Sequence, residues 1–364
     1  MKVLVAPLDW GLGHATRCVP LVRFMVQLGW KVTLAGEGPS LTLLSQEFPE
    51  LTTIPLKGYR ILYPKSGALL IPRLLVQIPK ILKTIKLENE WLKESFALEN
   101  WDLVISDNRY GLYHPKIKCI FITHQVWVLS GWGNFIDRVL NKKLHQWIRQ
   151  FNQCWIPDER ENGGIAGVLS HPPVLSSLFP CLPAGRLFPT TYIGPLSRLT
   201  KQNCTEQNQI LVLLSGPEPQ RSLLEQKLLE QIKQIDEQFL FVRGLPSASH
   251  KLENTRNVHF ENHLASAQLS QAISSAKLVV CRSGYSSVMD LLKMDKKAIL
   301  IPTPGQTEQL YLGKELAAKN WFVTQKQAEL QLKTAIQLCL SDTQARPLLD
   351  FEAYKQVLAD LGTQ

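Results

Sequence analysis

The chain has 364 residues, of which 45% are apolar and 20% charged, and this ordinary globular composition excludes wholesale disorder. The length is more than one hydrophobic core needs, so we expect two domains. The formal net charge is +9, and residues 1–195 carry most of it, with 21 Lys or Arg and 14 Asp or Glu. Seven scattered cysteines without a CxxC pair argue against a disulfide framework and a structural zinc site. Without a signal peptide or a long apolar run, the sequence predicts a cytoplasmic protein.

The chain begins with a predicted strand, loop, helix and strand. Lys2–Pro7 is a short apolar run typical of a strand, and a glycine-bearing loop follows at Asp9–Gly13. Cys18–Leu28 has the apolar spacing of a helix, and Trp30–Ala35 is the next predicted strand. This order is the repeating unit of a parallel sheet. Further apolar runs predict strands buried on both faces at Leu103–Ser106, Cys119–Thr123 and Cys154–Ile156.

Residues 57–86 hold seven Lys or Arg and no acidic residue, with leucines and isoleucines between them. Pro64, Pro72 and Pro79 divide this stretch, which predicts short segments rather than one long straight helix. Short apolar segments beside basic residues bind anionic lipid surfaces, so peripheral attachment to the inner face of the cytoplasmic membrane is one interpretation. The other is that the leucines pack in a core and the lysines are solvated. Nothing in the stretch predicts a nucleic acid partner.

The same pattern begins again in the second half. Ile210–Leu214 is a run of five aliphatic residues, followed by Ser215-Gly216-Pro217 and by a predicted helix at Ser222–Asp236. Two successive α/β halves predict two Rossmann-like domains that face each other across a cleft. Three more predicted strands lie at Phe239–Arg243, Leu278–Cys281 and Lys297–Pro302.

The predicted domain boundary lies near Gly194-Pro195-Leu196-Ser197. We expect an N-terminal domain over residues 1–195 and a C-terminal domain over residues 196–345. A last helix at about Leu348–Leu361, within residues 346–364, is expected to pack back on the first domain.

The loop Gly11-Leu12-Gly13-His14 follows the first predicted strand, as a dinucleotide fingerprint would. Position 16, where that fingerprint has its third glycine, is Thr16, although Glu37 lies near the end of the second strand. A partial fingerprint is a weak signal, and NAD binding remains only a minor alternative.

The C-terminal half carries a more specific pattern. Cys281–Ser287 joins a strand to a helix with small hydroxyl residues and glycine, so free backbone N–H groups can meet an anion there. Asp290 lies about two turns into that helix, where it can reach sugar hydroxyls. The loop Thr303–Gln309 ends in a carboxylate beside an amide, a pair that can read a sugar. Helix capping is the structural alternative for these residues.

Together these pieces resemble glycosyltransferases of the GT-B fold, in the family 28 group. The similarity is closest to the peptidoglycan lipid-intermediate N-acetylglucosaminyltransferase and the diacylglycerol galactosyltransferases, and it extends over essentially the whole chain. The motifs that carry it are Gly11-Leu12-Gly13-His14, Ser215-Gly216, Arg282-Ser283-Gly284 with Asp290, and Gly305-Gln306 with Glu308-Gln309.

The resemblance implies a UDP-sugar on the C-terminal domain and a lipid-linked or glycan acceptor on the N-terminal domain. It implies a co-substrate rather than a tightly bound cofactor, and no metal; no DxD-like or His/Cys ligand cluster is present in the sequence. Pro217 and Pro219 replace part of the family's glycine-rich loop and remove backbone donors. The implied donor-binding residues are Gly13, Ser215, Gly216, Arg243, Gly244, Arg282, Ser283, Gly284, Tyr285, Asp290, Gln306, Glu308 and Gln309.

Transfer to a hydroxyl needs a general base. Candidates are His14, whose residue type titrates near neutral pH, and Asp9 in the same loop; the resemblance favours His14. Four residues that follow strands of the first domain are candidates for the acceptor side: Asp107, Asn108, Arg109 and His124. Two other activities stay open, a UDP-sugar epimerase of the same fold and a non-catalytic nucleotide- or glycan-binding relative.

Overall fold

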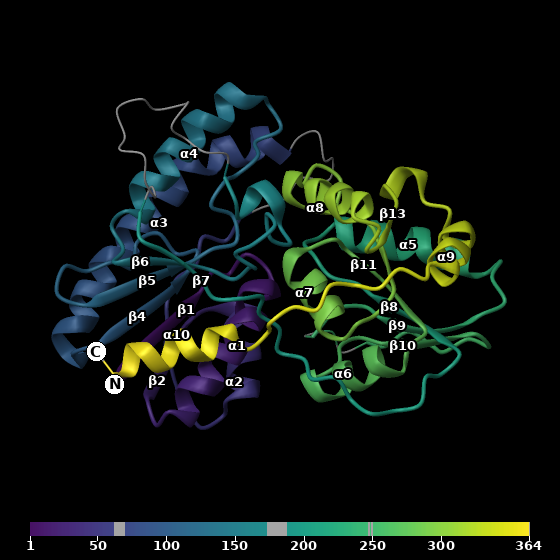
Figure 1. The fold of residues 1–364 in the computed structure, drawn as a ribbon, viewed down its shortest axis with the longest axis horizontal. Coiled ribbons are helices and arrows are strands. Elements are labelled where there is room, and N and C mark those ends of the chain that lie inside the picture. The colour runs from purple at the N-terminus through teal and green to yellow at the C-terminus, as the bar shows by residue number, and fades with distance from the viewer. Residues whose placement is uncertain (62–69, 173–187, 247, 249, 364) are drawn as a thin grey trace. The chain divides into compact units, whose positions relative to one another are not determined.

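The computed structural model describes residues 1–61, 70–172, 188–246, 248 and 250–363 (Figure 1). The chain divides into two compact units. Unit 1 comprises Met1–Ile61, Leu74–Leu196 and Leu349–Gln364, and unit 2 comprises Ser197–Leu348 with a short preceding segment. Each unit is built on one parallel sheet, so the predicted α/β class is confirmed.

The sheet of unit 1 has seven strands in the order β3-β2-β1-β4-β5-β6-β7. Its central strands bury side chains on both faces, because Val3 and Val5 belong to one hydrophobic cluster while Leu4 and Ala6 belong to another. This explains the continuous apolar runs in the sequence. The strands are β1 (Lys2–Pro7), β2 (Lys31–Gly36), β3 (Thr52–Pro55), β4 (Leu103–Asp107), β5 (Lys118–Ile122), β6 (Gln153–Ile156) and β7 (Thr190–Tyr192).

One helix of unit 1 begins earlier than predicted. α1 starts at Leu12 rather than near Cys18 and ends at Gln27, so Leu12 and Gly13 of the predicted loop belong to the first turn of the helix. The other helices of the unit are α2 (Gly38–Glu47), α3 (Leu70–Glu99), α4 (Asn134–Ile148) and α10 (Ala353–Gly362), with a 3₁₀ turn at Gly167–Leu169.

The prediction that prolines divide residues 57–86 is wrong for the helical part. α3 runs without interruption through Pro72 and Pro79 from Leu70 to Glu99. Pro72 lies in the first turn, where the backbone N–H has no helical partner in any case. Pro79 lacks a backbone N–H and so removes one hydrogen bond from the interior of the helix. The helix nevertheless continues to Glu99. Pro64 lies outside the described residues.

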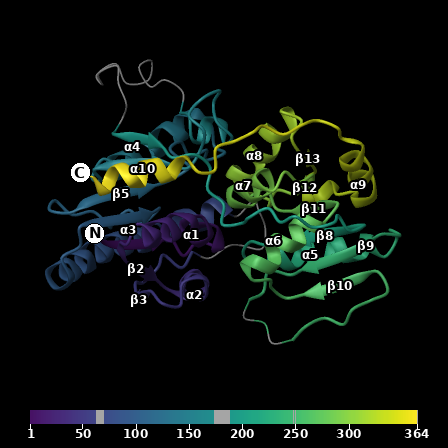
Figure 2. The ribbon, with the colours of Figure 1, turned by 60° about the horizontal axis from the view of Figure 1, so that its bottom comes forward.

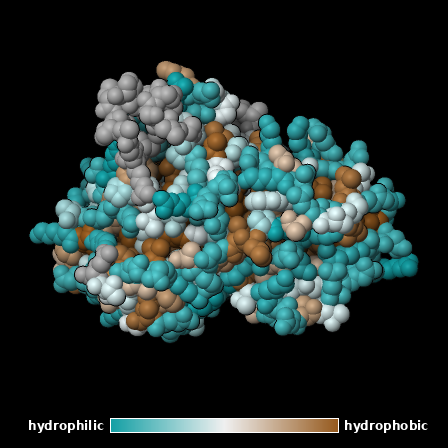
Figure 3. All heavy atoms as spheres, in the orientation of Figure 1, coloured by the Kyte–Doolittle hydropathy of each residue, from teal (hydrophilic) through white to brown (hydrophobic). Residues whose placement is uncertain are grey.

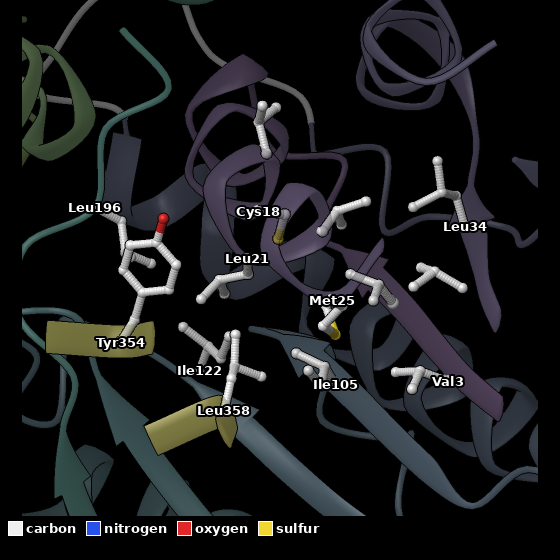
Figure 4. Close-up of a cluster of buried hydrophobic side chains, with 14 of the residues drawn as sticks. Val3, Cys18, Leu21, Met25, Leu34, Ile105, Ile122, Leu196, Tyr354 and Leu358 are labelled. Carbon is white, nitrogen blue, oxygen red and sulfur yellow. The ribbon is translucent and has the colours of Figure 1, made fainter. Parts of the chain in front are cut away.

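The last helix packs within unit 1. Figure 4 shows Tyr354 and Leu358 of α10 beside Leu21 of α1, in the same buried cluster as Ile122 of β5. Phe24 of α1 meets Tyr354 edge to face, with ring centroids 6.2 Å apart. α10 accordingly lies beside α1 in both ribbon views (Figures 1 and 2).

Unit 2 has a six-stranded parallel sheet in the order β10-β9-β8-β11-β12-β13. Its strands are β8 (Gln209–Leu213), β9 (Gln238–Val242), β10 (Val258–Glu261), β11 (Leu278–Cys281), β12 (Ala298–Leu300) and β13 (Val323–Thr324). Its helices are α5 (Gln220–Ile232), α6 (Ser266–Ser275), α7 (Tyr285–Lys293), α8 (Thr307–Ala318) and α9 (Leu332–Ser341). Ile210, Phe241 and Val280 are at the centre of its core.

The surface drawn in Figure 3 is mostly hydrophilic, with hydrophobic side chains scattered between polar ones. Within the ranges that the structure describes, no helix combines the length and the apolar character needed to cross a bilayer.

Candidate functional site

Three candidate residues of unit 1 follow neighbouring strands. β1 pairs with β4 so that Pro7 lies opposite Asp107, and Asp107 lies opposite Ile122 of β5. His14 lies in the first turn of the helix after β1, and His124 comes two residues after β5. The carboxyl ends of parallel strands form the usual ligand-binding edge of an open sheet, and the strand order reverses here between β1 and β4.

The three side chains share one hydrogen-bond network with Arg17. Nδ1 of His14 lies 2.8 Å from Oδ1 of Asp107. Arg17 donates from Nε to Oδ2 of Asp107 at 2.5 Å, and a terminal nitrogen of the same guanidinium bonds Oδ1. Arg17 also contacts Nδ1 of His124 at 2.7 Å. The structure therefore brings His14, Asp107 and His124 together, as a site at this edge requires.

The partners of His14 select one tautomer of its ring. A carboxylate only accepts hydrogen bonds, so Nδ1 of His14 carries the proton that it shares with Asp107. Arg17 also lies 3.0 Å from Nδ1 and can only donate, so it competes with Asp107 for this nitrogen; the contact with the carboxylate is the shorter of the two. Nε2 then holds the lone pair. No described residue is a hydrogen-bond partner of Nε2, and 15% of the His14 side chain is exposed.

Asp107 stays ionised although it is fully buried. Burial alone would raise the pKa of its carboxyl group, but the charge of Arg17, followed by His14, holds that pKa well below its ordinary value. Burial also raises the pKa of the neighbouring Cys18 thiol, whose Sγ lies 3.6 Å from Oδ2 of Asp107. Asp107 is therefore a fixed negative charge behind His14.

Asp9, the other candidate base, supports a loop. Its two carboxylate oxygens accept the backbone N–H groups of Tyr59 at 2.8 Å and of Arg60 at 2.9 Å. Gly58 packs so closely on this carboxylate that a Cβ would come within 2.2 Å of Cγ. Both oxygens of Asp9 are thus engaged by the backbone of this loop.

Arg109 is buried and serves the structure of unit 1. Its guanidinium donates to the carbonyl of Pro7 at 2.8 Å and to the carboxylate of Glu88 at 2.9 Å. Glu88, which the sequence did not single out, also accepts from the hydroxyl of Tyr59 at 3.1 Å, and burial raises its pKa to about 7. Asn108 is half-buried in a left-handed conformation (φ 55°). Of the four acceptor-side candidates, Asp107, Arg109 and His124 are buried and Asn108 is half-buried.

The donor candidates of unit 2 follow four neighbouring strands. Leu213 at the end of β8 lies opposite both Val242 of β9 and Cys281 of β11, and Cys281 lies opposite Leu300 of β12. The loops after these strands therefore lie at one edge of the sheet. They carry Ser215 and Gly216, Arg243 and Gly244, Arg282 to Tyr285, and Gln306 to Gln309.

Two of these loops are joined by direct hydrogen bonds. Ser283, which is buried, donates from Oγ to the carbonyl of Gln309 at 2.8 Å. The amide of Gln309 accepts from the backbone of Thr303 at 2.9 Å and donates to Gln306 at 2.5 Å. Gly284 is the N-cap of α7, the buried Tyr285 is its first residue, and Glu308 lies in the first turn of α8. Two helix N-termini thus meet at this edge.

The two arginines among the donor candidates are engaged in unit 2. Arg243 donates to Glu225 at 2.6 Å. Arg282 is buried, and its hydrogen bonds go to uncharged oxygens, the shortest to the carbonyl of Gln220 at 2.7 Å. Burial lowers its pKa to about 10. Gly216 has φ 101°, a conformation that favours glycine after β8.

Asp290 lies on α7 and accepts a hydrogen bond from the hydroxyl of Ser197 at 2.5 Å. Burial raises the pKa of Asp290 to about 6, although Ser197, Arg198 and Lys293 act in the opposite direction. Ser197 was not predicted as a site residue, since only the fold brings the linker to α7.

Like Glu88 and Ser197, Arg17 was not predicted from the sequence. Arg17 lies three positions after His14 on the same face of α1, but the predicted helix began only at Cys18, so the sequence did not reveal this spacing. Within the described part of the chain, no group of three or more His, Cys, Asp or Glu is arranged to hold a metal ion.

Residues 214–355 match the Glycosyltransferase family 28 C-terminal domain. The kitacinnamycin glycotransferase structure is 16% identical, with a TM-score of 0.65, and the match covers 99% of this chain and 93% of that one. The spinosyn rhamnosyltransferase SpnG is 14% identical in two complexes, with spinosyn aglycone (TM-score 0.58) and with thymidine diphosphate (TM-score 0.59). Both matches cover 100% of this chain and 96% of SpnG. The comparison with curated proteins found no match.

At these identities the structural similarity establishes the fold. The chain has the GT-B fold and resembles glycosyltransferases of family 28, so both of these predictions are confirmed. The two comparisons together support glycosyl transfer as its activity.

Proposed function

We propose that this protein transfers a sugar from a UDP-sugar to a hydroxyl group of a lipid-linked or glycan acceptor, with His14 as the general base. The observation that carries the proposal is the contact between Nδ1 of His14 and Oδ1 of Asp107 at 2.8 Å. It favours the tautomer in which Nε2 can accept a proton, and it places a buried negative charge behind the ring.

The proposed reaction is a single transfer. The acceptor hydroxyl gives its proton to Nε2 of His14, and its oxygen forms a bond to the anomeric carbon of the donor sugar. The bond between that carbon and the diphosphate oxygen breaks, and UDP leaves with the electron pair. Asp107 stabilises the imidazolium that forms, and Arg17 keeps Asp107 ionised and oriented.

Unit 2 is proposed to stabilise the leaving UDP. The N-termini of α7 and α8 present backbone N–H groups, and helix dipoles favour an anion there. The buried Arg282 bonds only uncharged oxygens, so a diphosphate nearby would supply a compensating negative charge. We propose that Asp290 accepts hydrogen bonds from the ribose hydroxyls. These groups supply the electrostatic stabilisation that a metal provides in other transferases, so the proposed transfer needs none.

A screen of nucleotide sugars tests this function. Donor binding raises the unfolding temperature by mass action, and the donors that bind are then incubated with a panel of lipid-linked and glycan acceptors. Acceptor-dependent release of UDP, together with a glycosylated product seen by mass spectrometry, supports the proposal. A sugar epimerised without any acceptor would instead indicate an epimerase, and binding without turnover a non-catalytic protein. Comparing the affinities for UDP and for TDP decides whether this protein binds a uridine nucleotide, as proposed, or a thymidine nucleotide like the one in the SpnG complex.

A further inference from the structure

Residues 126–130 begin two positions after His124, and they belong to neither a helix nor a strand. The backbone of this segment is nevertheless anchored at several points. The N–H of Trp127 donates to the carbonyl of Leu169 at 2.9 Å. Further hydrogen bonds come from side chains of one helix of unit 1, α4 (Figure 1).

Three residues of α4 that hold the segment are both buried and polar, and they recur every four positions on one helix face. Each bonds the backbone of the segment: Asp137 accepts from the N–H of Ser130 (2.7 Å), Asn141 bonds the N–H and the carbonyl of Val128 (both 2.8 Å), and His145 donates from Nε2 to the carbonyl of Val126 (2.8 Å). A surface helix normally buries its apolar face, so this polar face needs an explanation.

The explanation lies in matched spacings. Four residues of a helix rise about 6.0 Å, and two residues of extended chain span about 6.6 Å. One face of α4 therefore meets every second residue of the segment, in the antiparallel direction. It supplies the partners that buried backbone groups require and that a neighbouring strand would otherwise supply.

His124, just before this segment, completes the contacts of Arg17. Nε and one terminal nitrogen of the Arg17 guanidinium bond Asp107. The other terminal nitrogen, Nη1, lies 2.7 Å from Nδ1 of His124. Because a guanidinium only donates, Nδ1 of His124 is the acceptor. The ring of His124 is therefore neutral, with its proton on Nε2.

The hydrogen bonds from α4 bear on His124 because this residue lies between two fixed points. The N–H of Thr123 donates to the carbonyl of a residue of β6 at 3.1 Å, and the carbonyl of Val126 is held by α4. A shift of residues 126–130 would therefore move the His124 ring relative to Arg17.

From this chain of contacts we propose that Asn141 is a positioning residue for the transfer reaction. Its amide bonds both backbone groups at the middle of the segment. The segment orients His124, which with Arg17 orients the carboxylate behind His14. The kinetic consequence rests on the proposed function, whereas the contact between His124 and Arg17 can be measured without turnover.

The contact is tested by nuclear magnetic resonance of the full chain labelled with ¹⁵N-histidine, at pH 8, where an ordinary histidine is neutral. The variant His124→Gln assigns the signals of His124, and the exposed His250 gives the reference for a ring in water. We expect Nδ1 of His124 to be unprotonated and hydrogen-bonded in the wild type. In Asn141→Leu its signal should move toward that of His250. A protonated Nδ1 in the wild type, or an unchanged signal in Asn141→Leu, would overturn the proposal.

The kinetic test uses a matched variant in unit 2. Gln231 of α5 bonds the carbonyl of Leu330 at 2.8 Å and the N–H of Leu332 at 2.7 Å, so Gln231→Leu removes the same kind of backbone clamp as Asn141→Leu. We expect kcat to fall about 10- to 100-fold in Asn141→Leu, with an unchanged KM for the donor. Gln231→Leu should keep the kcat of the wild type. An equal fall in both variants would show that lost stability is the cause and would overturn the proposal.

A second pair of variants separates the hydrogen bond from the packing of α4. The side-chain amide of His145→Gln can still donate to the carbonyl of Val126, whereas His145→Leu cannot. We expect His145→Gln to retain both the His124 signal and kcat, and His145→Leu to lose both. Equal losses in the two would contradict the proposal, and this pair decides it if Asn141→Leu does not fold. If no donor and acceptor react with the wild type, the proposed function fails, and the His124 signal alone decides this inference.

Discussion

Arg17 and Asp107 form a two-pronged ion pair between α1 and the end of β4, with Nε of Arg17 2.5 Å from Oδ2 of Asp107. Both side chains are almost fully buried. The pair joins the helix that carries His14 to the strand that carries its partner. It therefore sets the position of His14 as well as the charge behind it.

Replacing Arg17 should destabilise unit 1. In Arg17→Ala the carboxylate of Asp107 stays buried with only His14 and Cys18 beside it, and breaking a buried pair in this way costs about 3–5 kcal/mol. Urea denaturation measures the loss. The control is Arg23→Ala on the same helix, whose half-exposed ion pair with Glu47 should contribute less than about 1 kcal/mol. Equal losses in the two variants would refute a special role for Arg17.

Arg109 is predicted to act on stability rather than on an acceptor. Arg109→Ala leaves Glu88 buried without its cation and frees the carbonyl of Pro7, so we expect a loss of about 3–5 kcal/mol. The exposed Arg160 provides the control variant, Arg160→Ala. If Arg109→Ala is as stable as the wild type but binds the acceptor more weakly, this prediction is contradicted and Arg109 contacts the acceptor.

The sequence predicts the buried parts of both sheets well and their edges poorly. β1 and β11 are found where their apolar runs predict them, because both faces of these strands are covered. The four strands that were not predicted are the four sheet edges: β3, β7, β10 and β13. β3 is almost wholly exposed and β13 has only two residues, so neither leaves an apolar run in the sequence.

The residues of the candidate site were likewise predicted only in part. Asp107 was identified because it directly follows a predicted strand, and His14 because it lies in the loop after the first predicted strand and the resemblance favours a histidine there. Parallel strands bring both positions to one edge. The roles of Asp9 and Arg109 depend on Tyr59 and Glu88, which are some 50 and 21 positions away. Contacts over such distances are set by the folded chain and leave no local pattern in the sequence.

Asp290 gives the stability of unit 2 a pH dependence. Its pKa is raised to about 6, so the folded state favours the protonated carboxyl, and this contribution is lost as the pH rises through about 6. Asp290→Asn removes the cost of holding this half-buried charge. We expect the variant to exceed the wild type in stability by up to about 3 kcal/mol at pH 8 and by little near pH 4. The exposed Asp236→Asn should show no such difference; a pH-independent effect of Asp290→Asn would contradict this account.

Asp290 is also the proposed ribose contact. Asp290→Ala should lower UDP affinity roughly 10- to 100-fold, because a charge-assisted hydrogen bond is lost. Isothermal titration calorimetry at pH 8, where the carboxylate is ionised, measures this change. The affinity of Asp236→Ala serves as the reference. Unchanged UDP affinity in Asp290→Ala would remove this residue from the donor site.

The role of His14 as the base is tested most directly by separating turnover from donor binding in His14→Ala. With a donor and acceptor identified by the screen, we predict that turnover falls about 10²- to 10⁴-fold while UDP affinity stays close to that of the wild type. The exposed His250→Ala should keep both values. Near-normal turnover in a folded His14→Ala protein would contradict the assignment of His14 and the mechanism built on its contact with Asp107.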